Sequence, residues 1–70
     1  MHNEIQGTHH YVLTFDLPGE EVATWDGTVT PGTLDTRHDV YVFLRECAVA
    51  ERPQFANAST VFFALERNTL

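Results

Sequence analysis

One cysteine and one histidine of the sequence have the side-chain types of a nucleophile and its base. A Cys47 thiolate could attack an electrophilic carbon if the His38 imidazole took its proton. The two residues lie nine positions apart in a segment of helical periodicity, and about 100° of rotation per residue turns them to opposite sides of a helix. Cys47 also falls on the apolar side, where we expect a buried structural thiol. The sequence therefore predicts no catalytic pair within one chain.

The histidines also include candidate metal ligands, because imidazole nitrogen binds zinc and other transition metals. His2 lies near the start of the chain, and His9 and His10 are adjacent in or beside a predicted strand. Successive side chains of a strand point to opposite faces, so His9 and His10 cannot bind one ion together. We therefore expect no metal site. The dispersed glycines form no phosphate-binding loop, so no cofactor is expected either.

Three acids gather where the chain turns, at Asp16, Glu20 and Glu21. Carboxylates act as general acid and base in clefts that shift their pKa values, whereas a turn is convex and hydrated. We expect this cluster to keep the turn solvated, with docking of a basic partner as the alternative. Tyr11 and Trp25 could stack on a ligand, but they lie at positions typical of a core or an interface.

The charge balance argues against several classes of partner. Ten acidic residues against four arginines give a formal net charge of −6. The arginines form no run, so the chain is not expected to bind nucleic acid or an anionic membrane. The single cysteine allows no intrachain disulfide, and residues 1–8 lack the basic and apolar regions of a signal peptide. We therefore expect a cytoplasmic protein.

Hydrophobic periodicity divides the chain into three strands and one helix. Residues 1–8 are polar and are expected to form a flexible arm, and residues 9–70 a single α+β domain. Alternation predicts strands over residues 10–17, 20–30 and 59–66. The apolar positions of the predicted helix are Val40, Phe43, Leu44, Cys47 and Ala48.

Capping signals set the ends of that helix. Thr36 and Asp39 have the spacing of a capping box, in which each side chain accepts a hydrogen bond from the other residue's amide. Pro53 disfavours a helical conformation at the residue before it. The helix is therefore expected to begin after Thr36 and to end near residue 51.

The Pro-Gly pair at residues 18–19 predicts a turn, and the length of the loop decides which face Trp25 occupies. A two-residue loop pairs Val12 with Trp25, whereas a three-residue loop pairs Leu13 with Trp25. We favour the longer loop because it gathers the apolar residues on one face. Residues 26–27 are a candidate β-bulge.

The predicted order, β-β-α-β, gives a three-stranded, mainly antiparallel sheet in the order 2-1-3, with the helix packed on one face. The predicted interface residues on the other face are Val12, Thr14, Phe62 and Ala64, joined by Trp25 in the short-loop register. Such a face is too apolar for water, and the sheet also has two open edges. We therefore expect a homodimer, or a larger assembly, formed sheet-to-sheet or edge-to-edge.

The chain carries the segments GTVTPG at residues 27–32, TRHDVY at 36–41 and VFFALERN at 61–68. With these segments it resembles short actinobacterial proteins of unassigned function over most of residues 9–70. The resemblance implies a cytoplasmic bacterial protein and carries over no functional residue.

The leading functional hypothesis is a non-enzymatic interaction module that self-associates through its sheet and presents an acidic surface to a protein partner. The alternative is a small-molecule binder whose pocket forms between protomers and is lined by Tyr11, Trp25 and Phe62. A small enzyme would need a site shared across a dimer, since no catalytic residues are expected within one chain.

Overall fold

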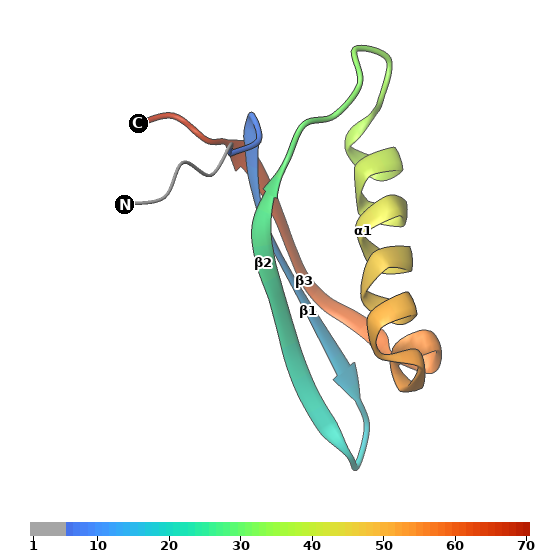
Figure 1. Cartoon of the computed structure of the whole chain (residues 1–70). Coiled ribbons are helices and arrows are strands. Elements are labelled where there is room, and N and C mark those ends of the chain that lie inside the picture. Colours follow the sequence, from blue (N-terminus) through green and yellow to red (C-terminus); the bar gives the residue numbers. More distant parts are fainter. Residues whose placement is uncertain (1–5) are drawn as a thin grey trace.

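The computed structural model describes residues 6–70 and has the predicted element order. The elements are β1 (His9–Leu17), β2 (Glu21–Val29), α1 (Arg37–Glu51), a short 3-10 helix η1 (Pro53–Asn57) and β3 (Ser59–Arg67). The sheet order is β2-β1-β3, both strand pairs are antiparallel, and α1 covers one face (Figure 1). The predicted α+β fold with the strand order 2-1-3 is confirmed.

The hairpin between β1 and β2 has the longer of the two loops considered. Leu17 pairs with Glu21 across three residues, so the favoured register is confirmed. The Glu20 amide donates to the Leu17 carbonyl at 2.9 Å, and Gly19 has a φ of 76°. These features fit a type II turn, in which Pro18 presets the first central position and only glycine adopts the second without strain.

The irregularity of the sheet lies in β3 and not at residues 26–27, where a bulge was predicted. The β1–β2 register runs without interruption there. The β1–β3 register shifts after Thr14, which leaves Val61 as the extra residue of a bulge. Gly27 instead makes room for an aromatic side chain, since a Cβ at this position would lie 3.3 Å from the Tyr11 hydroxyl oxygen.

Both ends of α1 are set by the residues that predicted them. Thr36 Oγ1 accepts from the Asp39 amide at 3.1 Å, and Asp39 Oδ2 accepts from the Thr36 amide at 3.0 Å. These hydrogen bonds stabilise the carboxylate, so the pKa of Asp39 lies below its ordinary value. At the other end the Arg52 amide donates to the Ala48 carbonyl, and Pro53 begins the next element.

The core lies between the sheet, α1 and η1. Its buried residues are Leu13, Phe15, Val40, Leu44, Ala48, Phe55 and Ala58. Phe15, Trp25 and Phe55 pack together, with ring centroids 5.3 to 5.9 Å apart. Phe55 is fully buried although it comes from a five-residue 3-10 helix, so η1 closes the lower end of the core.

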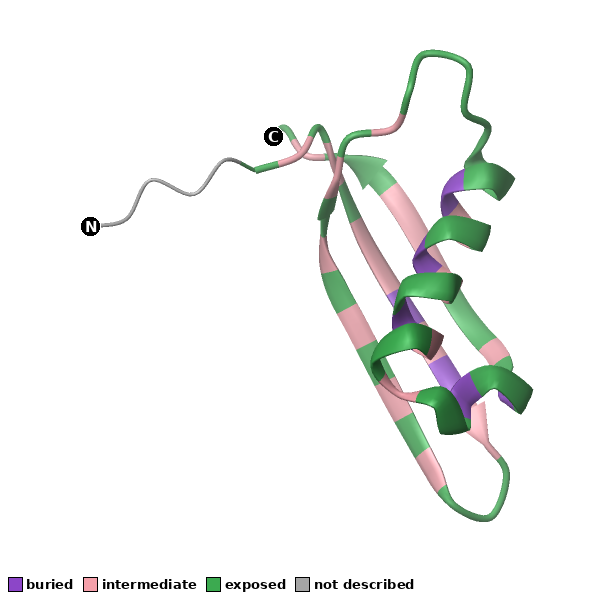
Figure 2. Cartoon of the chain, turned by 45° about the vertical axis from the view of Figure 1, so that its right-hand side comes forward, coloured by how far each residue is buried: buried purple, intermediate pink, exposed green. Residues whose placement is uncertain are grey.

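The buried stripe of α1 is narrower than the periodicity predicts. Figure 2 shows the buried residues of α1 on its inward side, and these are Val40, Leu44 and Ala48. Phe43 remains 54% exposed and Cys47 is also exposed. The expectation of a buried Cys47 is therefore wrong. Helix α1 is bonded to β3 through Arg37 and Tyr41, and its other flank, which carries Phe43 and Cys47, is left exposed.

Residues 6–8 connect the ends of two strands. The Gly7 amide donates to Thr28 Oγ1 at 2.9 Å. The Asn68 amide donates to the Thr8 carbonyl at 2.9 Å, and Asn68 Nδ2 donates to the Gly7 carbonyl at 3.2 Å. The flexible arm expected over residues 1–8 stays a prediction, since residues 1–5, with His2, lie outside the described part of the chain.

Candidate interaction surfaces

The face of the sheet opposite α1, called here the open face, is defined by the strand pairing. Leu13 and Phe15 point into the core, so their neighbours in β1 point the other way. The open face consists of His10, Val12, Thr14 and Asp16 on β1, Val22, Thr24, Asp26 and Thr28 on β2, and Ser59, Phe62, Ala64 and Glu66 on β3. Within residues 6–70 no other element packs against it (Figure 1).

Four of the five predicted interface residues lie side by side on this face. Val12 pairs with Ala64, and Thr14 pairs with Phe62, so the four form one block across β1 and β3. Phe62 is 53% exposed. The Oγ1 atoms of Thr14 and Thr24 are 2.9 Å apart, so the two hydroxyls form a hydrogen bond across the strands.

The fifth predicted interface residue, Trp25, does not belong to this surface. It pairs with Leu13 and therefore points to the helix-covered side. There its ring packs edge-to-face against Phe15 and Phe55. The reason is the period of two in a strand: the three-residue loop that gathers the core residues also moves Trp25 to their face.

Two apolar residues of this region were missed. Val22 pairs with Asp16 on the open face and is 66% exposed. Its position follows from the same register that places Trp25, so the sequence held the signal. Val61, at the bulge, is also exposed, but a bulge in β3 depends on how the strand fits its neighbour and has no marker in the sequence.

The three acids near the turn do not form one surface. Asp16 lies on the open face, and Glu20 is exposed in the turn. Glu21 faces the helix side, where its Oε1 lies 2.8 Å from Arg52 Nη2. That guanidinium also lies 5.0 Å from the ring centroid of Phe55. Glu21 is thus already paired with a cation of its own chain.

The proposed aromatic pocket does not form within one chain. Tyr11 and Trp25 lie on the helix side, whereas Phe62 lies on the open face. The Tyr11 ring is half-buried, and its pKa is raised first by burial and then by the negative charge of Asp26. A ligand could not touch all three aromatic residues of one protomer.

Within residues 6–70, the histidines and Cys47 remain apart. Among the described residues no group of three His, Cys, Asp or Glu side chains could hold a metal ion. His9 Nδ1 lies 2.9 Å from Thr8 Oγ1, and the His38 ring lies 6.1 Å from that of Tyr41, on the flank of α1 away from Cys47.

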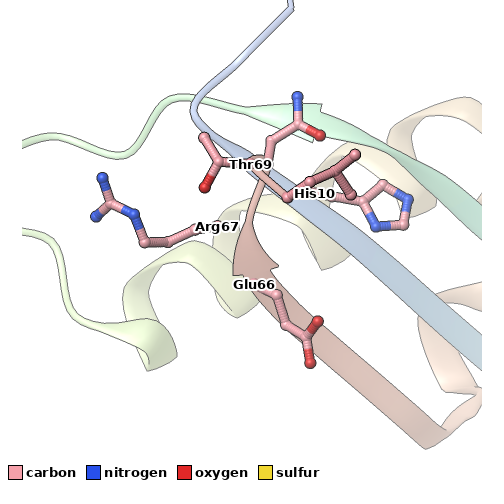
Figure 3. Close-up of a pocket in the computed structure, with 6 residues that line it drawn as sticks. His10, Glu66, Arg67 and Thr69 are labelled. Atoms are coloured by element: carbon pink, nitrogen blue, oxygen red, sulfur yellow. The ribbon is translucent and has the colours of Figure 1, made fainter.

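A shallow cavity of about 280 Å³ lies where β3 ends, and His10 borders it. The lining is formed by His10, Glu66, Arg67, Asn68, Thr69 and Leu70. Figure 3 shows the side chains of Glu66 and Arg67 pointing apart, as expected for neighbours in a strand. The charged groups do not converge on a common point, so the cavity has no arrangement suited to catalysis.

Comparison of the chain with protein-family models, with curated proteins and with solved structures gave no match. The resemblance to actinobacterial proteins therefore stays a prediction. Within the described part of the chain, no helix has the length and apolar character needed to cross a membrane.

Proposed function

We propose that the protein is a non-enzymatic interaction module that forms a homodimer by packing the open faces of two sheets together. The observation that carries the proposal is the apolar block of exposed Phe62 with half-buried Val12 and Ala64, to which β2 adds exposed Val22. Exposed apolar side chains at the centre of a flat face gain free energy when a second copy removes them from water.

The size of the open face predicts a weak dimer. Strands about 4.8 Å apart and residues about 3.3 Å apart give a flat area of about 14 by 30 Å, or about 400 Å². If all of this area were apolar, about 25 cal/mol per Å² would make it worth at most about 10 kcal/mol, against a cost of association of about 4–15 kcal/mol. The net gain is then at most about 6 kcal/mol, so we expect dissociation at tens of micromolar or above.

Packing through the face is favoured over pairing through the β3 edge. Arg37 Nη2 donates to the main-chain carbonyl of Phe63 at 3.0 Å, and its guanidinium lies 4.7 Å from the centroid of the Phe63 ring. A second strand added at this edge would have to displace that hydrogen bond. Side chains that occupy main-chain groups in this way protect sheet edges from pairing.

The charges of the open face predict how salt affects the dimer. The acids Asp16, Asp26 and Glu66 surround the apolar block, and each chain has a net charge of −6. Two copies therefore repel each other, and salt screens this repulsion over about 10 Å or less. We expect the dimer to become tighter as the salt concentration rises.

Analytical ultracentrifugation over a range of concentrations and salt tests the proposal. The expected mass rises from 7.9 kDa toward twice that value. Phe62→Glu should hold the protein at the monomer mass, whereas the control Leu34→Glu, at a residue 93% exposed in the loop before α1, should not. A wild-type protein that remains monomeric at about 1 mM would contradict the proposal.

A further inference from the structure

The helix-covered side of the sheet has an asymmetry that the proposed dimer does not use. Helix α1 is bonded to β3: the Tyr41 hydroxyl lies 2.7 Å from Thr60 Oγ1, and the Tyr41 ring packs edge-to-face on Phe63. Among the described residues, the hydrogen bond that joins the helix region to β2 comes from Arg52, the residue that caps the end of α1, and reaches Glu21 beside the turn. The helix is therefore held toward β3, and α1 leaves part of the helix side of β2 uncovered.

A groove results between α1 and β2, called here the α1–β2 groove. Phe43, which is 54% exposed, lines it at the start of α1, and Cys47, one helical turn further along the same flank, is also exposed. Tyr11 and Trp25 are half-buried on the helix side of the sheet. The groove widens into a cavity of about 290 Å³ at the start of α1. The cavity is lined by Val29, Thr30, Pro31, Asp35, Asp39, Val40 and Phe43.

The wall of the groove opposite α1 is an unprotected edge strand. β2 has nine residues, pairs with β1 alone, and contains neither proline nor lysine. Among the described residues no side chain donates to its main chain, in contrast to the bond from Arg37 to Phe63 on β3. Figure 2 shows residues of β2 alternating between intermediate and exposed along the strand, with none buried. Such an edge can accept a further strand.

The charges around the groove decide between a second copy and another partner. The acids that line or approach the groove are Asp35, Asp39 and Glu51, whereas Asp26 of β2 points to the open face. The arginines lie elsewhere: Arg37 is bonded to Phe63, Arg45 to the carbonyls of residues 56 and 58, and Arg52 to Glu21. A second copy, itself at −6, would place acids against acids. A cationic segment is complementary.

We propose that the α1–β2 groove binds an extended, cationic segment of a partner protein, which pairs with the free edge of β2. Alternate side chains of an added strand point to the helix side, where apolar residues would contact Trp25 and Phe43. Lysine or arginine residues between them would point to the open-face side of β2, where Asp26 lies, and a basic residue at the end of the segment beside the start of α1 would approach Asp35 and Asp39. Strands of about 5–6 residues are typical, so a segment of that length suffices. The site is on the opposite side of the sheet from the proposed dimer and does not depend on it.

A labelled peptide of alternating lysine and valine, capped at both ends, is a suitable probe, with a glutamate–valine peptide as its control. We expect saturable binding by anisotropy, a change in the fluorescence of Trp25, the single tryptophan, and weaker binding as salt rises. Equal binding of the glutamate peptide, or no binding of the lysine peptide at about 1 mM, overturns the proposal.

Strand pairing and groove contact are tested separately. N-methylation of one alternate set of peptide residues should abolish binding and methylation of the other set should not, because only one set donates to β2. Phe43→Ala should weaken binding about tenfold, and Val42→Ala, at a residue exposed on α1 outside the lining of the groove, should leave it unchanged. Equal effects of both methylated sets, or no effect of Phe43→Ala, overturn the proposal.

The two interaction proposals fail independently. The Phe62→Glu monomer should still bind the lysine–valine peptide, and Phe43→Ala should still dimerise. If Phe43→Ala abolished dimerisation and the peptide competed with it, the groove would be occupied by a second copy, and the cationic partner would be excluded.

Discussion

The two flanks of α1 differ in how they meet the sheet. On the β3 flank, Arg37, Tyr41 and Arg45 contact β3 or the segment before it through hydrogen bonds and ring contacts. On the β2 flank, Phe43 and Cys47 are exposed, and among the described residues neither makes such a contact. One helix is too narrow to cover a three-stranded sheet evenly, and specific polar contacts determine which strand it leaves uncovered.

The test with the largest expected effect compares substitutions at two neighbouring residues of α1. Leu44 is 6% exposed and Phe43 is 54% exposed. We expect Leu44→Ala to lower the free energy of unfolding by about 2–5 kcal/mol, because it leaves a cavity. Phe43→Ala should cost less than about 1 kcal/mol. Urea denaturation at a concentration below dimer formation measures both. Equal costs would show that the β2 flank is covered in solution.

The next test removes one hydrogen bond between the β3 flank of α1 and the sheet. Tyr41→Phe deletes the hydroxyl that lies 2.7 Å from Thr60 Oγ1 in a partly buried position. The expected loss in the free energy of unfolding is about 1 kcal/mol, the usual contribution of such a bond. The matched control is Tyr11→Phe, at a residue on the helix side of β1, and its loss in the free energy of unfolding should be smaller. A larger effect at Tyr11 would reverse the assignment of the two flanks.

A third test concerns the start of α1, where the cavity of the groove opens. Thr36→Ala removes the side chain that accepts from the Asp39 amide and should cost about 1 kcal/mol. The capping bonds lower the pKa of Asp39 below 3.8, so their stabilisation is present above that pH and is lost as the pH falls through the folded-state pKa. Thermal unfolding between about pH 2 and 7 should therefore be less pH-dependent in Thr36→Ala. If thermal stability fell as steeply at low pH in Thr36→Ala as in wild type, the role assigned to the cap would be wrong.

The smallest expected effect is at the ion pair between the hairpin and the end of α1. Both side chains of Glu21 and Arg52 are more than a third exposed. Glu21→Gln should therefore cost between about 0 and 1 kcal/mol, and the difference should shrink in salt. Denaturation at low and high salt compares it with wild type. A larger, salt-independent cost would mean that the pair fixes the position of the helix.

The elements were predictable because local signals agree with the hydrophobic periods. The turn at residues 18–19, the cap at Thr36 and the stop at Pro53 each act within a few residues, and each is found where predicted. The register of the hairpin followed from the same reasoning. The open face was predicted correctly for Val12 and Phe62, because alternation alone places them there.

The lateral position of α1 could not be predicted in this way. Periodicity marks a wide apolar stripe that includes Phe43 and Cys47, but it does not say which part of the stripe the sheet covers. That choice depends on contacts distant in sequence, such as Tyr41 with Thr60. Arg37, Tyr41 and Arg45 recur at four-residue spacing, and this polar stripe was the available sign of the flank that faces β3.

The bonds between residues 6–8 and Asn68 have a consequence for the connectivity of the fold. Since the Asn68 amide donates to the Thr8 carbonyl, a short linker could join the end of β3 directly to β1, and the exposed loop at Leu34 could supply new termini. The rearranged chain would run α1, η1, β3, β1, β2. Its sheet would be a simple meander in which every pair of adjacent strands is consecutive in sequence. The crossover from β2 to β3 therefore depends on the position of the chain termini. A circular permutant could keep the same packing without it.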